Sequence, residues 1–257
     1  RDEAGDAAAL AAAAGAGWDW LIVDHYERGA VFERAARPLA ARLLAIDDLA
    51  DRAHDCDVLV DSSHGAEEAG EYDALVPPAC RRLVGQDYVI LRKAFRALTP
   101  TPPRAGPVRR LLVSLGGNDP VGMTIRALRT LARPQFAHLE IEATSSRANL
   151  RLEEVRAAAA ALPNARLHVD TAAFEPILQS VDLCLGAGGT TTWERMYLGK
   201  PALVAMLADN QTRITGRLAG LGLIASLGHA RDFDDDYLAA RLAEALADSG
   251  WRLRAAQ

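Results

Sequence analysis

Two glycine-rich stretches carry the residue types best suited to binding a phosphate group. Gly116-Gly117-Asn118-Asp119 follows a short apolar run, and Gly186-Ala-Gly-Gly-Thr-Thr-Thr-Trp-Glu194 follows another. Glycine lets the backbone approach a ligand closely, and backbone N–H groups at a helix start attract phosphate. The hydroxyls of Thr190 to Thr192 would add donors, although they also make reasonable helix caps. We therefore predict an anion site, with ordinary strand-to-helix turns as the alternative for both stretches.

Glu194 stands one turn inside the helix that the second stretch begins. A carboxylate there can accept two hydrogen bonds from the vicinal hydroxyls of a ribose, and the alternative is an acid stabilised by the helix dipole. The chain has no GxGxxG after its first strand and no Walker lysine pattern, so neither a dinucleotide nor ATP is favoured. No cluster has zinc spacing, and we expect no metal and no cofactor. His54 and His64 are interpreted as solvated loop residues.

The chain after residue 107 alternates between short apolar runs and amphipathic stretches. Such runs are typical of buried parallel strands, and their alternation with helices implies right-handed crossovers and a doubly wound sheet. Ligands of these sheets bind beyond the carboxyl ends of the strands, where both glycine stretches fall. The predicted strands span 110–115, 138–144, 166–169, 181–185, 201–206 and 223–226, and the predicted helices span 121–133, 147–162, 173–179 and 210–219, with one more from about Thr190.

The first hundred residues are similar in kind but less regular. We predict helices over 7–14 and 27–36, and strands over 19–23, 42–46 and 57–60. Three strands are few for an independent sheet, so we expect earlier β-α units in a longer protein and an open, association-prone sheet edge here. No clear terminal element is predicted over 251–257.

A proline-rich stretch separates the two halves. Thr99 to Pro107 has four prolines in nine residues, which cannot sustain a helix or an inner strand and instead indicate a stiff connector. We predict an α/β protein with two Rossmann-like parallel-sheet domains that face a cleft. The amino-terminal domain spans 1–98 and is incomplete, the linker spans 99–107, and the carboxy-terminal domain spans 108–257.

Composition excludes several classes of partner. The net charge is −5 and the two signs are interspersed, which argues against nucleic acid or an anionic membrane surface as the main partner. No apolar run approaches the roughly 20 residues of a membrane span, and no secretory signal is present. Three cysteines without CxxC spacing fit a reduced cytosol, so a cytoplasmic location is expected and the oligomeric state stays open.

Several motifs occur in a fixed order along nearly the whole chain. They are Asp24-His25-Tyr26 with Ile46–Ala50, Val113–Pro120, Gly186–Glu194 with Leu198–Pro201 and Ala208–Gln211, and Leu83–Phe95. Together they resemble the nucleotide-sugar hydrolase of pseudaminic-acid biosynthesis, which removes UDP from UDP-2,4-diacetamido-2,4,6-trideoxy-β-L-altropyranose, and they are also similar to the related spore-coat polysaccharide proteins. The resemblance implies the glycosyltransferase-B architecture and a likeness to MurG-type transferases.

The resemblance also implies roles for matching positions, with UDP bound mainly by the carboxy-terminal domain. The family's catalytic histidine belongs to an amino-terminal GxGHxxR loop, which these residues do not contain, and His25 is not its equivalent. Tyr26 would lie beside the reacting sugar, and Tyr26 and Asn210 are the catalytic candidates present. Asn210 and Gln211 would hold the sugar and its phosphate, and Glu194 would hold the ribose. The diphosphate would be held by the loop of Gly188, Gly189, Thr190 and Thr191. The predicted UDP and substrate site is completed by Gly116, Gly117 and Asn118.

The reaction implied is hydrolysis with inversion at the anomeric carbon, which releases UDP and the free sugar. A diphosphate leaves already charged, so the chemistry needs charge stabilisation and a base that activates water. Without the family's histidine, this chain is expected to bind UDP but to turn over slowly. The alternatives are a transferase of the same fold that uses a UDP-sugar donor, and a non-catalytic UDP-sugar-binding module.

Overall fold

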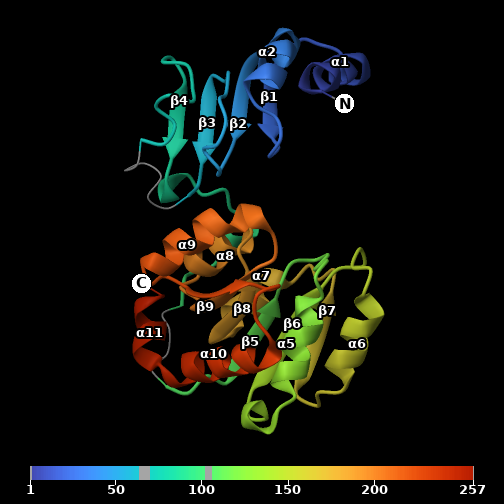
Figure 1. Ribbon diagram of the computed structural model, residues 1–257, viewed down its shortest axis with the longest axis vertical. Helices are drawn as coiled ribbons and strands as arrows, with labels where there is room; N and C mark the ends of the chain where they lie inside the picture. The colour runs from blue at the N-terminus through green and yellow to red at the C-terminus, as the bar shows by residue number, and fades with distance from the viewer. Residues whose placement is uncertain (1, 64–69, 102–105, 257) are drawn as a thin grey trace. The chain divides into compact units, whose positions relative to one another are not determined.

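The chain divides into two compact units, Arg1–Ile90 and Leu91–Gln257 (Figure 1). This computed structural model describes residues 2–63, 70–101 and 106–256. The division lies before the predicted boundary at residue 98, because the apolar side chain of Phe95 is fully buried in the core of the second unit. The helix that carries Phe95, α4 (Lys93–Arg96), therefore belongs with the second unit.

The first unit contains a four-stranded parallel sheet. Its three predicted strands are confirmed, and a fourth strand was not predicted because its two arginines interrupt the apolar run. The strand order is β1-β2-β3-β4, with bounds β1 (Trp18–Asp24), β2 (Ala40–Ile46), β3 (Val58–Asp61) and β4 (Arg81–Val84). The helical elements are α1 (Glu3–Ala14), α2 (Ala30–Ala36), η1 (Arg37–Leu39) and η2 (Gln86–Tyr88).

One face of β1 is covered and the other is not. Leu21 and Val23 contribute to the apolar clusters of this unit, in which α1 and α2 also pack. The alternate residues Trp18, Trp20 and Ile22 are 55%, 42% and 60% exposed. β1 is also the terminal strand of the described sheet.

The second unit contains a six-stranded parallel sheet of order β10-β9-β8-β5-β6-β7, which confirms the predicted doubly wound fold. Each of its predicted strands and helices is present. The strands are β5 (Arg110–Ser114), β6 (Glu140–Ser145), β7 (Ala165–Val169), β8 (Leu183–Ala187), β9 (Ala202–Met206) and β10 (Ala225–His229). The helical elements are α5 (Met123–Leu131), η3 (Pro134–Phe136), α6 (Leu152–Ala160), α7 (Phe174–Ser180), α8 (Thr191–Tyr197), η4 (Asp209–Gln211), α9 (Thr212–Gly220), α10 (Asp235–Ala247) and α11 (Ser249–Arg254).

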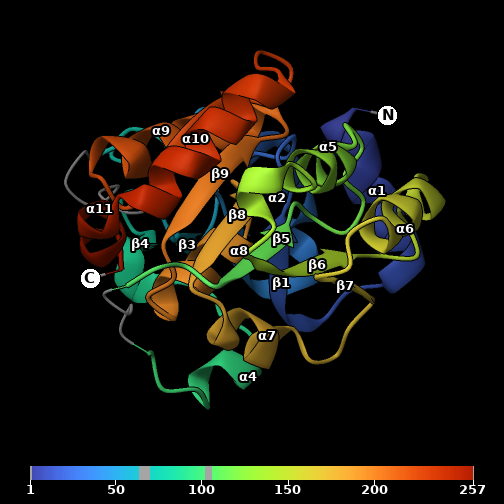
Figure 2. The same ribbon diagram turned by 90° about the horizontal axis from the view of Figure 1, so that it is seen from below.

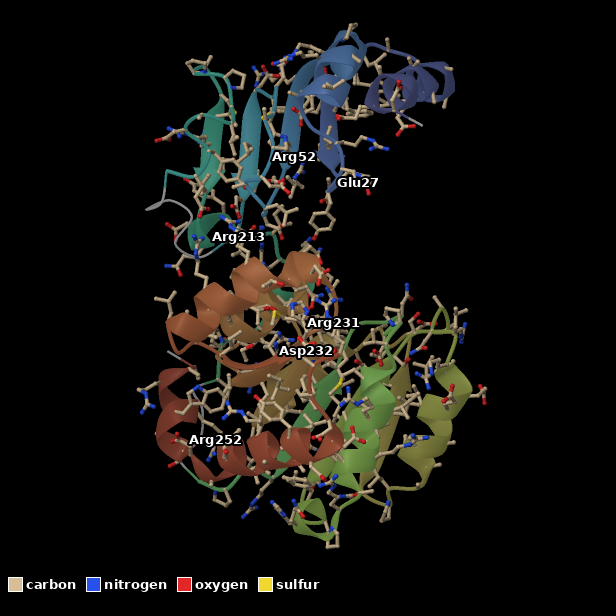
Figure 3. The ribbon with its side chains drawn as sticks, in the orientation of Figure 1. Glu27, Arg52, Arg213, Arg231, Asp232 and Arg252 are labelled. Carbon is tan, nitrogen blue, oxygen red and sulfur yellow. The ribbon has the colours of Figure 1, made fainter. Side chains whose placement is uncertain are left out.

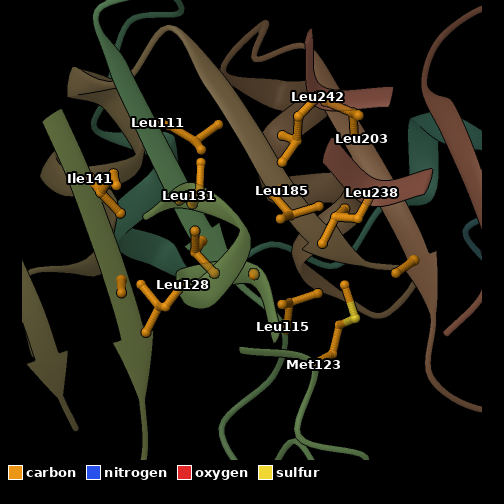
Figure 4. Close-up of a cluster of buried hydrophobic side chains, with 14 of the residues drawn as sticks. Leu111, Leu115, Met123, Leu128, Leu131, Ile141, Leu185, Leu203, Leu238 and Leu242 are labelled. Atoms are coloured by element: carbon orange, nitrogen blue, oxygen red, sulfur yellow. The ribbon is translucent and has the colours of Figure 1, made fainter. Parts of the chain in front are cut away.

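Helices cover both faces of this sheet. Leu111 packs under α5 and α10, whereas the next residue, Leu112, packs under α7 and α9 on the opposite face. Figure 2 shows α5 and α10 on one side and α7 on the other, and Figure 4 shows the first of these clusters around Leu128 and Leu185.

The carboxy-terminal segment is helical, contrary to the expectation of no clear element. Asp234 caps α10 by accepting a hydrogen bond from the Tyr237 amide, and Asp248 caps α11 in the same way through the Trp251 amide. Within the described ranges, none of the helices is both long and apolar enough to span a membrane.

Candidate functional site

Both glycine stretches follow strands that are neighbours in the sheet. Ser114 on β5 pairs with Gly186 on β8, so the loops 116–118 and 188–191 leave the same edge of the sheet side by side. The strand order reverses between β5 and β8, and the helices that follow them, α5 and α8, cover opposite faces. In doubly wound sheets ligands bind at such a switch point.

A third loop leaves the same edge from the next strand. Ala187 on β8 pairs with Ala205 on β9, which places 207–211 beside the glycine-threonine loop. The two loops are also packed closely together, because a Cβ built on Gly188 would lie 3.1 Å from the Gln211 Cβ. The structure therefore brings together the predicted diphosphate residues and Gln211.

The loop at Gly188 is tightly packed, whereas Gly189 is open. A Cβ on Gly188 would lie 2.5 Å from the Thr215 hydroxyl, which is buried and has no hydrogen-bond partner among the described residues. Gln211 Oε1 accepts a hydrogen bond of 2.8 Å from the Leu207 amide, so its carbonyl holds the loop, and its NH₂ group is by chemistry a hydrogen-bond donor. A Cβ on Gly189 would meet no atom within 4 Å.

The loop after β5 is largely explained by its own packing. Gly116 has a φ of 86°, which favours glycine, and a Cβ on Gly117 would lie 3.0 Å from the Ser146 Cβ. Asp119 is buried and accepts hydrogen bonds of 2.9 and 2.6 Å from amides of the first turn of α5. The ordinary-turn alternative accounts for these three residues, and the exposed Asn118 stays a predicted ligand contact.

Glu194 is 5% exposed and already has a cationic partner. Its Oε1 accepts a hydrogen bond of 2.9 Å from Arg92 Nε, and Arg92 Nη1 lies 2.9 Å from Glu175. Burial raises the pKa of Glu194, and the Arg92 guanidinium opposes that rise. Glu194 Oε2 accepts no hydrogen bond from the described residues, so one oxygen is left for the predicted ribose contact. Arg92 was not singled out from the sequence.

A polar corner at the ends of β9 and β10 lies next to Asn210 in the chain. Arg231, labelled in Figure 3, places its Nη2 2.7 Å from Asp209 Oδ1. His229 Nε2 lies 3.1 Å from the Thr212 hydroxyl. His229 was missed because the closing strand was predicted to end at residue 226, three residues before it. Its imidazole is a proton-transfer group at the same edge of the sheet as the glycine loops.

The Asp24-His25-Tyr26 motif lies in the first unit, where Asp24 is the last residue of β1. Tyr26 is 53% exposed, and the backbone of its loop is held by Arg52, whose Nη2 donates to the His25 carbonyl at 3.0 Å. Arg52 in turn pairs with Asp47 at 2.7 Å (Figure 3). The two catalytic candidates, Tyr26 and Asn210, therefore come from different units.

His54 is buried, which corrects its interpretation as a solvated residue. It is 4% exposed, and its Nδ1 lies 2.7 Å from Oε1 of the fully buried Glu33. The Tyr72 hydroxyl lies 2.8 Å from Asp47 and 3.0 Å from Asp61 at the ends of β2 and β3. These side chains come from separate elements, so no local pattern in the sequence indicates their contact. His64 lies outside the described residues.

The acids around His54 stabilise its charged form. Burial alone would lower the pKa of His54, but Asp47 and Glu33 raise it to about 9. The distances assign the larger share to Glu33, because Asp47 Oδ2 is 3.9 Å from Nε2 and too far for a hydrogen bond. The network is thus a buried ion pair beneath the loop that carries Tyr26.

A cavity of about 820 Å³ lies at the opposite, amino-terminal edge of the second sheet. Two of its cationic groups are engaged within the protein: Arg110 pairs with Glu140, and Arg252 donates to three backbone carbonyls. We therefore place the candidate site at the carboxyl edge rather than in this cavity, which is lined among others by Arg110, Asp182, Lys200 and Arg252.

Comparison with known sequences gives a distant relative of this chain. No protein-family model matches the chain. The spore coat polysaccharide biosynthesis protein SpsG of Bacillus subtilis (strain 168) is 25% identical over 170 residues, which are 66% of this chain and 50% of SpsG. The chain thus spans about half the length of that relative.

Solved structures with the same fold are more numerous. MurG of Acinetobacter baumannii aligns at a TM-score of 0.58 with 17% identity, over 93% of this chain and 68% of its own. MnaA of S. aureus, solved with UDP, aligns at 0.58 with 12% identity over 99% and 73%. The spinosyn rhamnosyltransferase SpnG aligns at 0.60 with 20% identity over 98% and 70%. The chain has two parallel-sheet α/β domains of the glycosyltransferase-B fold.

Proposed function

We propose that this protein is an enzyme that binds a UDP-sugar at the carboxyl edge of its second sheet and hydrolyses it at the anomeric carbon. The observation that carries the proposal is the convergence of the loops 116–118, 188–191 and 207–211 at the strand-order reversal. The relation to SpsG and the likeness to MnaA, which was solved with UDP, support a nucleotide-sugar ligand.

In this proposal the second unit stabilises the leaving group. The amides of the open Gly189 and the exposed Thr190 approach the diphosphate, and the hydroxyl of Thr191 and the amide NH₂ of Gln211 donate to its oxygens. Glu194 accepts from the ribose through its second oxygen. The negative charge that develops on UDP as the C–O bond breaks is thereby stabilised without an acid.

In this proposal Asn210 of the second unit holds the sugar, and Tyr26 of the first unit stays a separate catalytic candidate. Neither side chain is a competent base at neutral pH, and general-base catalysis is worth about 10²- to 10⁴-fold in rate. With these two side chains alone, we expect slow turnover. The resemblance to the pseudaminic-acid hydrolases supports a diacetamido-trideoxyhexose as the sugar.

Release of UDP without any acceptor tests this function against the transferase. The protein is incubated with UDP-2,4-diacetamido-2,4,6-trideoxy-β-L-altropyranose, and UDP and free sugar are quantified by mass spectrometry against heat-denatured protein. We expect equal amounts of UDP and free sugar. The sugar should be released with the configuration at C1 inverted relative to the substrate. UDP release that requires an added carbohydrate or lipid acceptor would assign the protein to the transferases, which the rhamnosyltransferase SpnG represents in this fold.

A further inference from the structure

Arg195 places a guanidinium directly beneath the glycine-threonine loop. It is 2% exposed, and its Nη2 donates to the Ala187 carbonyl at 2.9 Å and to the Thr192 hydroxyl at 3.0 Å. Its Nη1 lies 3.5 Å from the Thr191 hydroxyl. A Cβ on Gly186 would lie 2.2 Å from the same Nη1, so the absence of a side chain at Gly186 makes room for the guanidinium.

This buried cation has no carboxylate partner. No acidic oxygen of the described residues lies within 4.0 Å of the guanidinium, and its Nε makes no hydrogen bond in that part of the chain. Burial lowers the pKa of Arg195, but a guanidinium remains charged at neutral pH. Buried charges in proteins are usually paired, so a buried guanidinium without a carboxylate in contact, beside an exposed loop, points to an anionic partner that arrives from outside.

The second buried arginine of this unit shows the contrast. Arg252 is 4% exposed and donates to the carbonyls of Ala245 and Leu246 in the last turn of α10. The carboxyl end of a helix carries partial negative charge and stabilises a cation. The Arg195 side chain, which belongs to α8 itself, instead reaches back to Thr192 in the first turn, where the helix adds positive charge. The charge of Glu194 on the same helix raises the pKa of Arg195, but that carboxylate accepts its hydrogen bond from Arg92 and not from the Arg195 guanidinium.

We propose that Arg195 supplies the buried positive charge that makes this loop select ligands by the negative charge of their phosphates. The inference rests on the proposed UDP site. Arg195 acts as a positioning residue rather than a contact: it fixes the Ala187 carbonyl below the loop and faces the Thr191 oxygen, which leaves the Thr191 hydroxyl proton to donate toward the ligand.

Calorimetric titration of the 257-residue chain with uridine and with UDP tests this role. Arg195→Met removes the charge and keeps an unbranched side chain. We expect it to weaken UDP binding by at least about tenfold and uridine binding by less than about threefold, so that the preference for UDP falls. Arg195→Lys retains a cation and is the matched control, expected to keep the preference within about threefold.

Gly186→Ala provides a second variant that keeps the charge in the chain. Its Cβ would displace the guanidinium, so the preference for UDP over uridine should fall here too, even if Arg195→Met does not fold. Equal losses of UDP and uridine affinity, or none, in the folded variants would show a merely structural residue and overturn this inference alone. A folded wild-type chain that binds neither ligand would overturn the proposed function together with it.

Discussion

Gly188→Ala is expected to weaken UDP binding by at least about 100-fold, which corresponds to about 2.7 kcal/mol. The added Cβ would lie 2.5 Å from the Thr215 hydroxyl and 3.1 Å from the Gln211 Cβ. Neither atom is the far end of a flexible side chain, so the loop itself must move away from its neighbours. Calorimetry with UDP on the folded variant measures the loss.

Two further variants make this result specific. Gly216→Ala adds a methyl group on α9 where no atom lies within 4 Å, so it should leave UDP affinity unchanged. Gly188→Ala combined with Thr215→Ala removes the nearest clashing atom and should recover part of the lost affinity. Unchanged UDP binding by Gly188→Ala alone would place the ligand away from this loop.

His54→Ala is expected to lower the free energy of unfolding of the first unit by about 3 kcal/mol or more. The variant leaves the buried carboxylate of Glu33 without its cationic neighbour, whereas Asp47 keeps its ion pair with Arg52. His25→Ala, at an exposed position of the same unit, is the matched control and should cost less than about 1 kcal/mol. Urea unfolding, monitored by hydrogen exchange in residues 40–61, measures the free energy of unfolding of both variants.

The same residue predicts a pH dependence of definite sign. The pKa of His54 rises from an ordinary value of 6.5 to about 9 on folding, so its stabilisation is complete below pH 6.5 and is lost as the pH rises through 9. The loss amounts to at most about 3 kcal/mol. A His54→Ala variant that is as stable as wild type, or that keeps the same alkaline loss, would contradict the buried ion pair.

The second sheet was predictable because its strands are short apolar runs between glycine-bounded turns. Leu111 and Leu112 are buried on opposite faces, which gives a continuous apolar signal that no exposed face interrupts. The strand β4 lacks that signal because Arg81 and Arg82 are exposed. The domain boundary was displaced because prolines mark where regular structure stops, whereas the packing of Phe95 decides to which unit a segment belongs.

The candidate site was predictable only in its loops. Glycine and threonine at the end of a strand indicate an anion site by residue type, so Gly188 to Thr191 could be proposed from sequence alone. The side chains beneath the loop could not. Thr215 approaches the loop from α9. The Arg195 guanidinium contacts the Ala187 carbonyl and no carboxylate among the described residues, which only the folded structure shows. Such relations arise from packing between elements and leave no local pattern.

Hydrogen exchange of the chain with and without UDP tests the location of the site most directly. We predict that UDP slows amide exchange in peptides covering 186–194 and 207–215, at the carboxyl edge of the second sheet, and leaves 40–61 unchanged. Protection confined to the amino-terminal edge, in peptides covering 106–110 and 179–182 around the cavity of about 820 Å³, would contradict this account, as would no protection at saturating UDP.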